Sequence, residues 1–318
     1  MRRRKIMKKI ITMISILLAS WTFLAFNHGQ ALADTETPVV TLGGSLTASQ
    51  RQGTIDTLTQ PLNGSNYQTI TVTGSDLVKY LNPSGDNFTT SSGVWSSAMI
   101  QKTSSGSGIN VKILSYNGKN NITTITANQY KNAALTAGIT DANIYVTSAV
   151  PIDGSGALAG VYAAYAKNGN SLNQEQVNAA QDEINTLSGI TQENKDKDGY
   201  TDSQLNNAVA GAKSQMAKVG NNISDSQIRD IVTNQININH LGDTITNEQK
   251  NQIVNILIEI RDSGALKNSN FKQQAAELSK QIQAGAKNIF DKLNTPENRN
   301  FFQQLIDSIV NFFTSLFK

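Results

Sequence analysis

Apolar and polar positions alternate along residues 39–170 in a pattern that predicts strands separated by helices. Short apolar or alternating runs favour strands, and they occupy residues 39–42, 68–72, 98–102, 109–114 and 143–150. The turn-rich segment 104–108 lies between the third and fourth runs and predicts a hairpin that pairs them. Helical signals fill the remaining gaps, at residues 47 onward, 74–81, 126–138 and 157–167.

The pattern becomes purely helical from residue 171. Helix starts are marked by a Ser or Thr with Gln three residues later, an arrangement in which each side chain accepts a hydrogen bond from the other residue's backbone N–H. Such pairs begin at residues 47, 126, 201, 224 and 246. Apolar stripes at helical spacing follow the last two. A further helix is predicted over residues 271–293 and is weakened at Gly285.

These patterns predict an α+β fold, with an N-terminal mixed sheet and packed helices in residues 34–170 and an all-helical region in residues 171–318. The last helix, at about 296–318, begins at Thr295-Pro296 and is amphipathic. Its apolar side is a candidate face for a partner or a membrane and consists of Phe302, Leu305, Ile306, Ile309, Phe313, Leu316 and Phe317. Lys and Arg are scarce on the polar side, which favours packing or partner binding over contact with a membrane surface.

Residues 1–33 have the order of a secretory signal peptide. Six basic residues and no acidic one open the chain, 17 mostly apolar residues follow at 10–26, and Ala31-Leu32-Ala33 precedes Asp34. We expect cleavage before Asp34 and a secreted or extracytoplasmic protein associated with the cell envelope. Because the apolar run is long for a signal, an uncleaved N-terminal membrane anchor is the alternative.

Removal of this segment changes the charge balance. The whole chain has 27 Lys and Arg against 24 Asp and Glu, and six of the bases lie in residues 1–33, so the remainder carries 21 bases and 24 acids. This net acidity argues against nucleic acid as a partner. The chain contains no Cys, which excludes disulfides and thiol chemistry.

Three stretches carry a resemblance to a known family. They are VTLGGSLTASQ at residues 40–50, GVWSSAMI at 93–100 and AGITDANIYVTSAVPIDGSGALAGVYAAY at 137–165. In these stretches the chain resembles the YpuA-like exported proteins of Gram-positive bacteria, family 1002 of the domains of unknown function. The resemblance implies export and a cell-envelope setting, and it implies no established activity, cofactor or catalytic residue.

Gly154, Ser155 and Gly156 follow a strand and precede a helix rich in small residues, which is the outline of a dinucleotide-binding turn. Residues 151–153 intervene before the first glycine, and no acidic residue ends a following strand, so no cofactor is predicted. The small residues instead predict a helix that lies close to the sheet. The free N–H groups of a helix start leave an anion contact at these three residues as a second interpretation.

Other catalytic and metal-binding patterns are incomplete. Ser155 lacks the flanking glycines of a nucleophile elbow, and His240, the one His after residue 33, has no serine with a matching signature. Segment 194–202 spaces its oxygens like a calcium loop, but Leu205 stands where the bidentate Glu belongs, so an interhelical turn is favoured. Trp95 is expected in the core, with a glycan-stacking platform as the alternative. No catalytic or metal-binding residue is therefore assigned.

The sequence predicts a non-enzymatic binding or scaffolding module that contacts an unknown envelope component, either a protein or a cell-wall polymer. The alternative is an envelope hydrolase that uses a pair of aspartates. Residues 39–170 contain no Glu and five candidates: Asp56, Asp76, Asp86, Asp141 and Asp153. Several of these aspartates adjoin turn residues, where Asp commonly makes structural hydrogen bonds.

Overall fold

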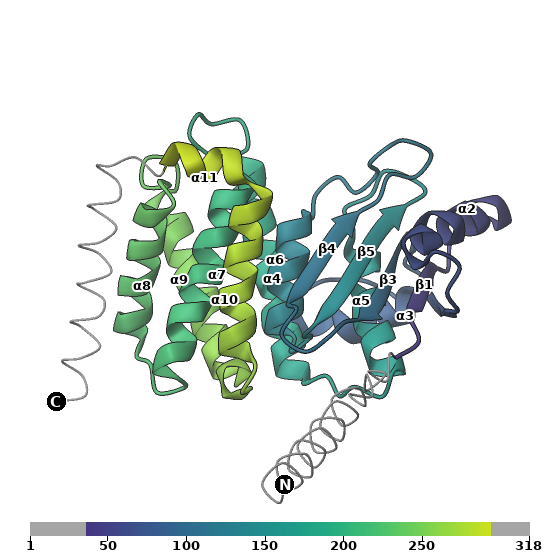
Figure 1. Cartoon of the computed structure of the whole chain (residues 1–318), viewed down its shortest axis with the longest axis horizontal. Helices are drawn as coiled ribbons and strands as arrows, with labels where there is room; N and C mark the ends of the chain where they lie inside the picture. The colour runs from purple at the N-terminus through teal and green to yellow at the C-terminus, as the bar shows by residue number, and fades with distance from the viewer. Residues whose placement is uncertain (1–35, 294–318) are drawn as a thin grey trace, which may run out of the picture. The chain divides into compact units, whose positions relative to one another are not determined.

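The computed structural model describes residues 36–293, in which a five-stranded sheet is followed by a set of packed helices (Figure 1). The strands run in the spatial order β2-β1-β3-β5-β4. β1 pairs with β2 and β4 with β5 in parallel, whereas β3 is antiparallel to both of its neighbours. This arrangement confirms the predicted α+β class and mixed sheet. The bounds are β1 Val39–Gly43, β2 Gln68–Val72, β3 Ser96–Lys102, β4 Ile109–Ile113 and β5 Ala142–Ser148.

The predicted hairpin between β3 and β4 is wrong, because β5 lies between them. Six of the seven residues of β5 are buried, so this strand is best placed in the interior of the sheet, where neighbours satisfy the ladder groups on both of its edges. The connection after β3 crosses the start of β5 and is held there by Asp141. The backbone oxygen of Asp141 accepts from Thr103 N at 2.7 Å, and its side chain accepts from Gly108 N at 3.0 Å.

Helices cover the two faces of the sheet unequally. α5 (Ser155–Lys167), α3 (Gly74–Tyr80) and α4 (Ala127–Thr136) pack on the face formed by alternate residues such as Ala98 and Val111. α2 (Ala48–Thr59) packs alone among the described helices on the opposite face. It forms a small separate cluster there, which contains Val40, Leu42, Leu58, Leu62, Met99 and Tyr145.

From α6 to residue 293, where the described residues end, the chain is helical, as predicted. The helices are α6 Gln174–Asn194, α7 Asp202–Val219, α8 Asp225–Ile238, α9 Asn247–Asp262, α10 Phe271–Gly285 and α11 Lys287–Leu293, with short 3₁₀ turns at η1 Gln60–Leu62, η2 Asn82–Ser84 and η3 Ala265–Lys267. The break between α10 and α11 falls at the predicted weak point, Gly285. Within residues 36–293, no helix combines the length and the apolarity that a bilayer span requires.

Four of the five predicted helix starts form complete reciprocal caps, at Thr47, Thr126, Ser224 and Thr246. The start of α7 at Thr201 is half-formed: the hydroxyl accepts from Gln204 N, but the Gln204 side chain donates to Asn239 O at 2.8 Å. The Gln204 side-chain oxygen accepts from Thr201 Oγ1 at 2.8 Å instead of from the Thr201 backbone N–H. Its amide nitrogen makes the contact to the end of α8, which the sequence pattern could not show.

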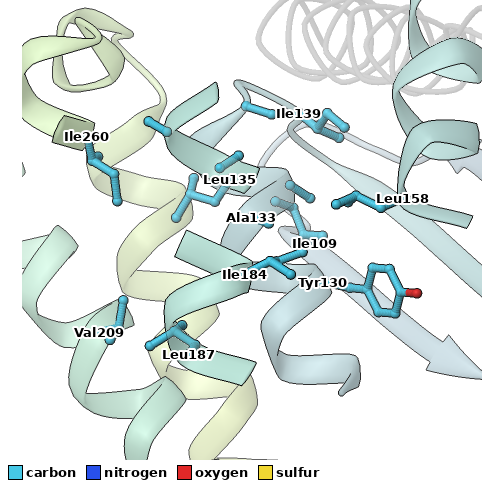
Figure 2. Close-up of a cluster of buried hydrophobic side chains, with 14 of the residues drawn as sticks. Ile109, Tyr130, Ala133, Leu135, Ile139, Leu158, Ile184, Leu187, Val209 and Ile260 are labelled. Carbon is cyan, nitrogen blue, oxygen red and sulfur yellow. The ribbon is translucent and has the colours of Figure 1, made fainter. Parts of the chain in front are cut away.

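One hydrophobic cluster runs through the sheet, α4 and the later helices (Figure 2). It includes Ile109 of β4, Leu158 of α5, Leu135 of α4, Ile184 of α6 and Val209 of α7. α4 is buried along most of its length, because β4 lies on one side of it and α6, α7 and α10 lie on the others. The sheet and the helices therefore share a core instead of meeting at a thin contact.

A polar network crosses this apolar core at α4. Lys213 of α7 and Glu183 of α6 form an ion pair at 2.5 Å with both side chains fully buried. Lys213 also donates to Asn132 O of α4 at 2.9 Å, and Thr136 Oγ1 of α4 donates to Glu183 at 2.7 Å. Burial lowers the pKa of Lys213, and the adjacent Glu183 opposes that shift. The pair thus fixes how α6 and α7 sit on α4.

Breaking one half of this pair should destabilise the whole fold. We expect Lys213→Met to lower the free energy of unfolding by about 3–5 kcal/mol, because it leaves a buried carboxylate unpaired. Adding Glu183→Gln should recover more than half of that loss, because the charge is removed while Thr136 keeps an acceptor. Denaturant unfolding followed by circular dichroism measures both values.

The exposed pair Lys280–Glu277, at 3.8 Å on α10, is the control. Lys280→Met should change stability by less than about 0.5 kcal/mol, because solvent screens such pairs. A single Lys213→Met variant as stable as the wild type would contradict the assigned role of the buried pair.

Candidate functional site

The glycine turn before α5 is closed by the protein's own groups. Gly154 has a φ of 114°, which L-residues rarely adopt. Asp153 Oδ1 accepts from Gly154 N at 2.7 Å and from Ser155 N at 3.2 Å, and Ser155 Oγ donates to Asp153 Oδ2 at 2.5 Å. Ser96 Oγ accepts from Ala157 N at 2.9 Å. The Asp153 carboxylate therefore occupies the position that an external anion would take at this helix start.

The small residues of α5 allow its backbone to approach the sheet. A Cβ atom at Gly160 would lie 2.4 Å from Thr41 Oγ1 of β1, a distance that no side chain tolerates. Gly156 is likewise buried against Val94 and Ser96. We therefore assign the glycines a packing role. The anion contact at Gly154, Ser155 and Gly156 stays a prediction. The backbone N–H groups of Gly154, Ser155 and Ala157 already donate to Asp153 and Ser96, so they do not support it.

The five aspartates of the sheet region are distributed among separate local structures. Asp56 accepts from Gln52 within α2, Asp76 accepts from Thr73 N at the start of α3, and Asp141 accepts from Gly108 N and Gln274. Asp153 caps α5, as described above. Asp86 follows η2 and accepts from Gln181 of α6 at 2.8 Å. Structural hydrogen bonds therefore account for all five positions.

Asp86 nevertheless belongs to a group of three carboxyls that the sequence did not indicate. We call this group, Asp86, Asp182 and Glu259, the carboxyl run. Burial raises the pKa of Asp182 on α6 to about 6, with further contributions from Glu259 of α9 and from Asp86. Burial also raises the pKa of Asp86, helped by Asp153, and that of Glu259, helped by Asp262. These residues come from distant parts of the chain, so only the packing of α6 against η2 and α9 brings them together.

The loop that resembles a calcium site uses the oxygens at its two ends, those of Asn194 and Asp202, in internal hydrogen bonds. Asn194 is fully buried, and its side chain accepts from Lys197 Nζ at 2.7 Å. Asp202 accepts from Thr126 Oγ1 at 2.9 Å and from Asn206 Nδ2 at 2.8 Å. Across residues 36–293, no group of three or more acidic or His side chains is arranged to hold a metal ion. The geometry favours the interhelical turn.

His240 and Trp95 have local roles. His240 adopts a φ of 53° in the turn that ends α8, and its backbone N donates to Asn237 O at 3.0 Å. The expectation that Trp95 is a core residue is wrong: it is half-buried, it belongs to neither hydrophobic cluster, and its ring lies against Gly93. The strand begins only at Ser96, so Trp95 lies just before β3, outside the sheet.

The face of the sheet on which α2 packs also carries a row of amide side chains. This row lies near the end of β3, whereas Trp95 precedes its start. Gln101 of β3, Asn143 of β5 and Asn110 of β4 are direct register neighbours on adjacent strands. They alternate with the core residues Ile100 and Ile144, so they point to the α2 face, and each is half-buried. Within the described part of the chain their amide groups make no hydrogen bonds. α2 contacts β1, β3 and β5, and Figure 1 shows it at the side of the sheet away from β4.

This amide row consists of Gln101, Asn143 and Asn110, and the exposed Lys112 of β4 lies next to it. The alternation of apolar and polar residues in the strands at 98–102 and 109–114 indicated which side chains would share a face. It could not show that β5 stands between them and completes the row. The predicted partner face Phe302, Leu305, Ile306, Ile309, Phe313, Leu316 and Phe317 lies outside the described residues.

The fold and site define an α+β protein with a mixed sheet, a helical layer on one face and a partly open polar surface on the other. The chain belongs to the family described as "Protein of unknown function (DUF1002)", whose model matches residues 42–278. It is 31% identical over 287 residues to the "Uncharacterized protein YpuA" of Bacillus subtilis (strain 168). The aligned stretch covers 88% of this chain and 89% of that relative. No solved structure matches the chain.

The raised pKa of Asp182 predicts how stability changes with pH. A carboxyl that is protonated more readily in the folded than in the unfolded state stabilises the fold as the pH falls from about 7 to about 4. We expect Asp182→Asn to raise the free energy of unfolding at pH 7.5 by about 1 kcal/mol, since solvent reaches the half-buried group and screens it. The difference from the wild type should shrink as the pH falls through 6.

Denaturant titrations at several pH values measure this difference. Asp230→Asn removes an exposed carboxylate from α8 and serves as the control with the same change of charge. If the two substitutions changed the free energy of unfolding equally at every pH, the raised pKa of Asp182 would not be the cause of the effect.

Proposed function

We propose that this protein is an exported, envelope-associated binding module without catalytic activity, and that it holds a cell-wall polymer on the amide row. The order of charged, apolar and small residues in 1–33 supports export. That segment lies outside the described residues, so the support comes from its sequence alone.

The observation that carries the proposal is the absence of internal partners for the amide row. Each Asn or Gln side chain both donates and accepts hydrogen bonds. Folded proteins usually satisfy half-buried polar groups internally or leave them to water. Gln101, Asn143 and Asn110 stand on neighbouring strands about 4.8 Å apart, so they present donors and acceptors at a regular spacing.

A polymer rich in hydroxyl and amide groups complements this surface. Such groups also both donate and accept, so each can replace the water on one side chain of the row. Strands hold the three amides more rigidly than a loop would, which limits the entropy lost on binding. Lys112 adds a positive charge at the margin for an anionic substituent of the polymer.

The alternative is an envelope hydrolase, and the carboxyls of Asp86 and Asp182 are the pair that would serve it. A carboxyl with a pKa of about 6 suits a general acid. Asp86 is already engaged by Gln181, however, and Asp153 has both oxygens committed to the start of α5. These engagements favour binding over catalysis.

The test is retention of the protein on purified cell-wall material. Residues 34–318 contain the whole described core and serve as the test protein. We expect the variant Gln101→Ala/Asn143→Ala/Asn110→Ala to be retained about tenfold or more weakly than the wild type, because each lost hydrogen bond contributes roughly 1 kcal/mol. Circular dichroism verifies that the variant is folded.

A matched control removes three exposed amides from α8 and α9 through Asn237→Ala/Gln252→Ala/Asn255→Ala. This variant should bind like the wild type. Equal retention of all three proteins would exclude the amide row as the contact surface. Release of soluble fragments that stops in Asp182→Asn would instead establish the hydrolase.

A further inference from the structure

β2 forms an open edge of the sheet. It pairs with β1 on one side, and no described strand lies on the other. Gln68, Thr69 and Thr71 are exposed, and Tyr67 just before the strand is the most exposed large hydrophobic residue described, at 38%. The strand contains no charged residue and no Pro, which are the usual means of protecting an edge.

The hydrogen bonds to β1 identify the free backbone groups of this edge. Gln68 N donates to Pro38 O at 2.8 Å, and Val72 O accepts from Gly44 N at 2.7 Å. In a parallel pair, alternate residues direct both of their groups to the partner strand. Gln68, Ile70 and Val72 therefore face β1, whereas Thr69 and Thr71 direct their N–H and C=O groups outward.

The geometry points to a second copy of this chain as the partner of this edge, with two β2 strands pairing antiparallel about a two-fold axis at Ile70. The axis places Thr69 opposite Thr71 of the second copy, and Thr71 opposite Thr69. Each of these pairs exchanges two N–H···O=C bonds. Every outward group is then satisfied, and the two sheets join into one.

The side chains fit this pairing as well. Thr faces Thr across the strands on the exposed side, and such pairs are favourable in antiparallel sheets. On the other side, the half-buried Ile70 meets its own copy at the axis. Because the strand has no charge, self-pairing brings no like charges together. A partner surface that is the same on both subunits is the normal form of a two-fold interface.

The contact is short, so the dimer is weak. Five residues of strand bury less area than a standard protein interface. Such a contact forms where the protein is concentrated, and it does not depend on the amide row, which lies on β3, β5 and β4 and is separated from β2 by β1.

Two charged variants test the register. In Thr69→Lys/Thr71→Lys, like charges face each other across the axis, whereas in Thr69→Lys/Thr71→Glu each pair joins opposite charges. Sedimentation of residues 34–318 over a range of concentrations should show a dimer at least about tenfold tighter for the Lys/Glu variant than for the Lys/Lys variant. Raised salt should reduce the difference.

Hydrogen exchange supplies a second readout, because the outward amides of Thr69 and Thr71 should become protected as the concentration rises. Thr71→Pro removes one outward N–H and should weaken the dimer, while Thr71→Val keeps that N–H and should not. A wild type that stays monomeric at millimolar concentration would overturn the inference. So would a dimer that responds equally to both charged variants, or protection of these amides only by a different protein.

Discussion

The arrangement of this protein depends on the burial of α4 between the sheet and the later helices. Its apolar residues join both parts of one core, and its polar residues receive the fully buried Glu183–Lys213 pair. Apolar contacts alone would tolerate several angles between packed helices, whereas a buried charge tolerates almost no displacement from its partner. The ion pair and its hydrogen bonds to Asn132 and Thr136 therefore specify one position for α6 and α7 on α4.

The burial of α4 also explains where the uncommitted amides and the clustered carboxyls lie. Helices and a shared core cover one face of the sheet. The opposite face is covered by α2 in part, and the uncommitted amides Gln101, Asn143 and Asn110 lie at its uncovered end. The carboxyls of Asp86, Asp182 and Glu259 are a product of the same packing, because α6 brings η2 and α9 to its two sides. The open edge at β2, the amide row and the carboxyls of Asp86, Asp182 and Glu259 therefore lie on different elements.

Local signals in the sequence predicted the elements well. Each strand was located to within about two residues, and four of five Ser/Thr–Gln caps form as the pattern indicated. These features depend on groups a few residues apart, so the sequence contains all of the relevant atoms. The failures were long-range. Thr201 shares its cap partner with Asn239, β5 separates β3 from β4, and Trp95 is left outside the core.

The sequence by itself determined the α+β class, the helix starts, the close approach of α5 to the sheet and the absence of thiol chemistry. These follow from side-chain period, capping chemistry and residue size, which act over one or two turns of chain. Tertiary structure alone decided the strand order, the pairing of Glu183 with Lys213, the amide row and the carboxyl run. Each requires residues from distant segments to meet. The free energy that brings them together comes from burial of the whole core, which no short segment encodes.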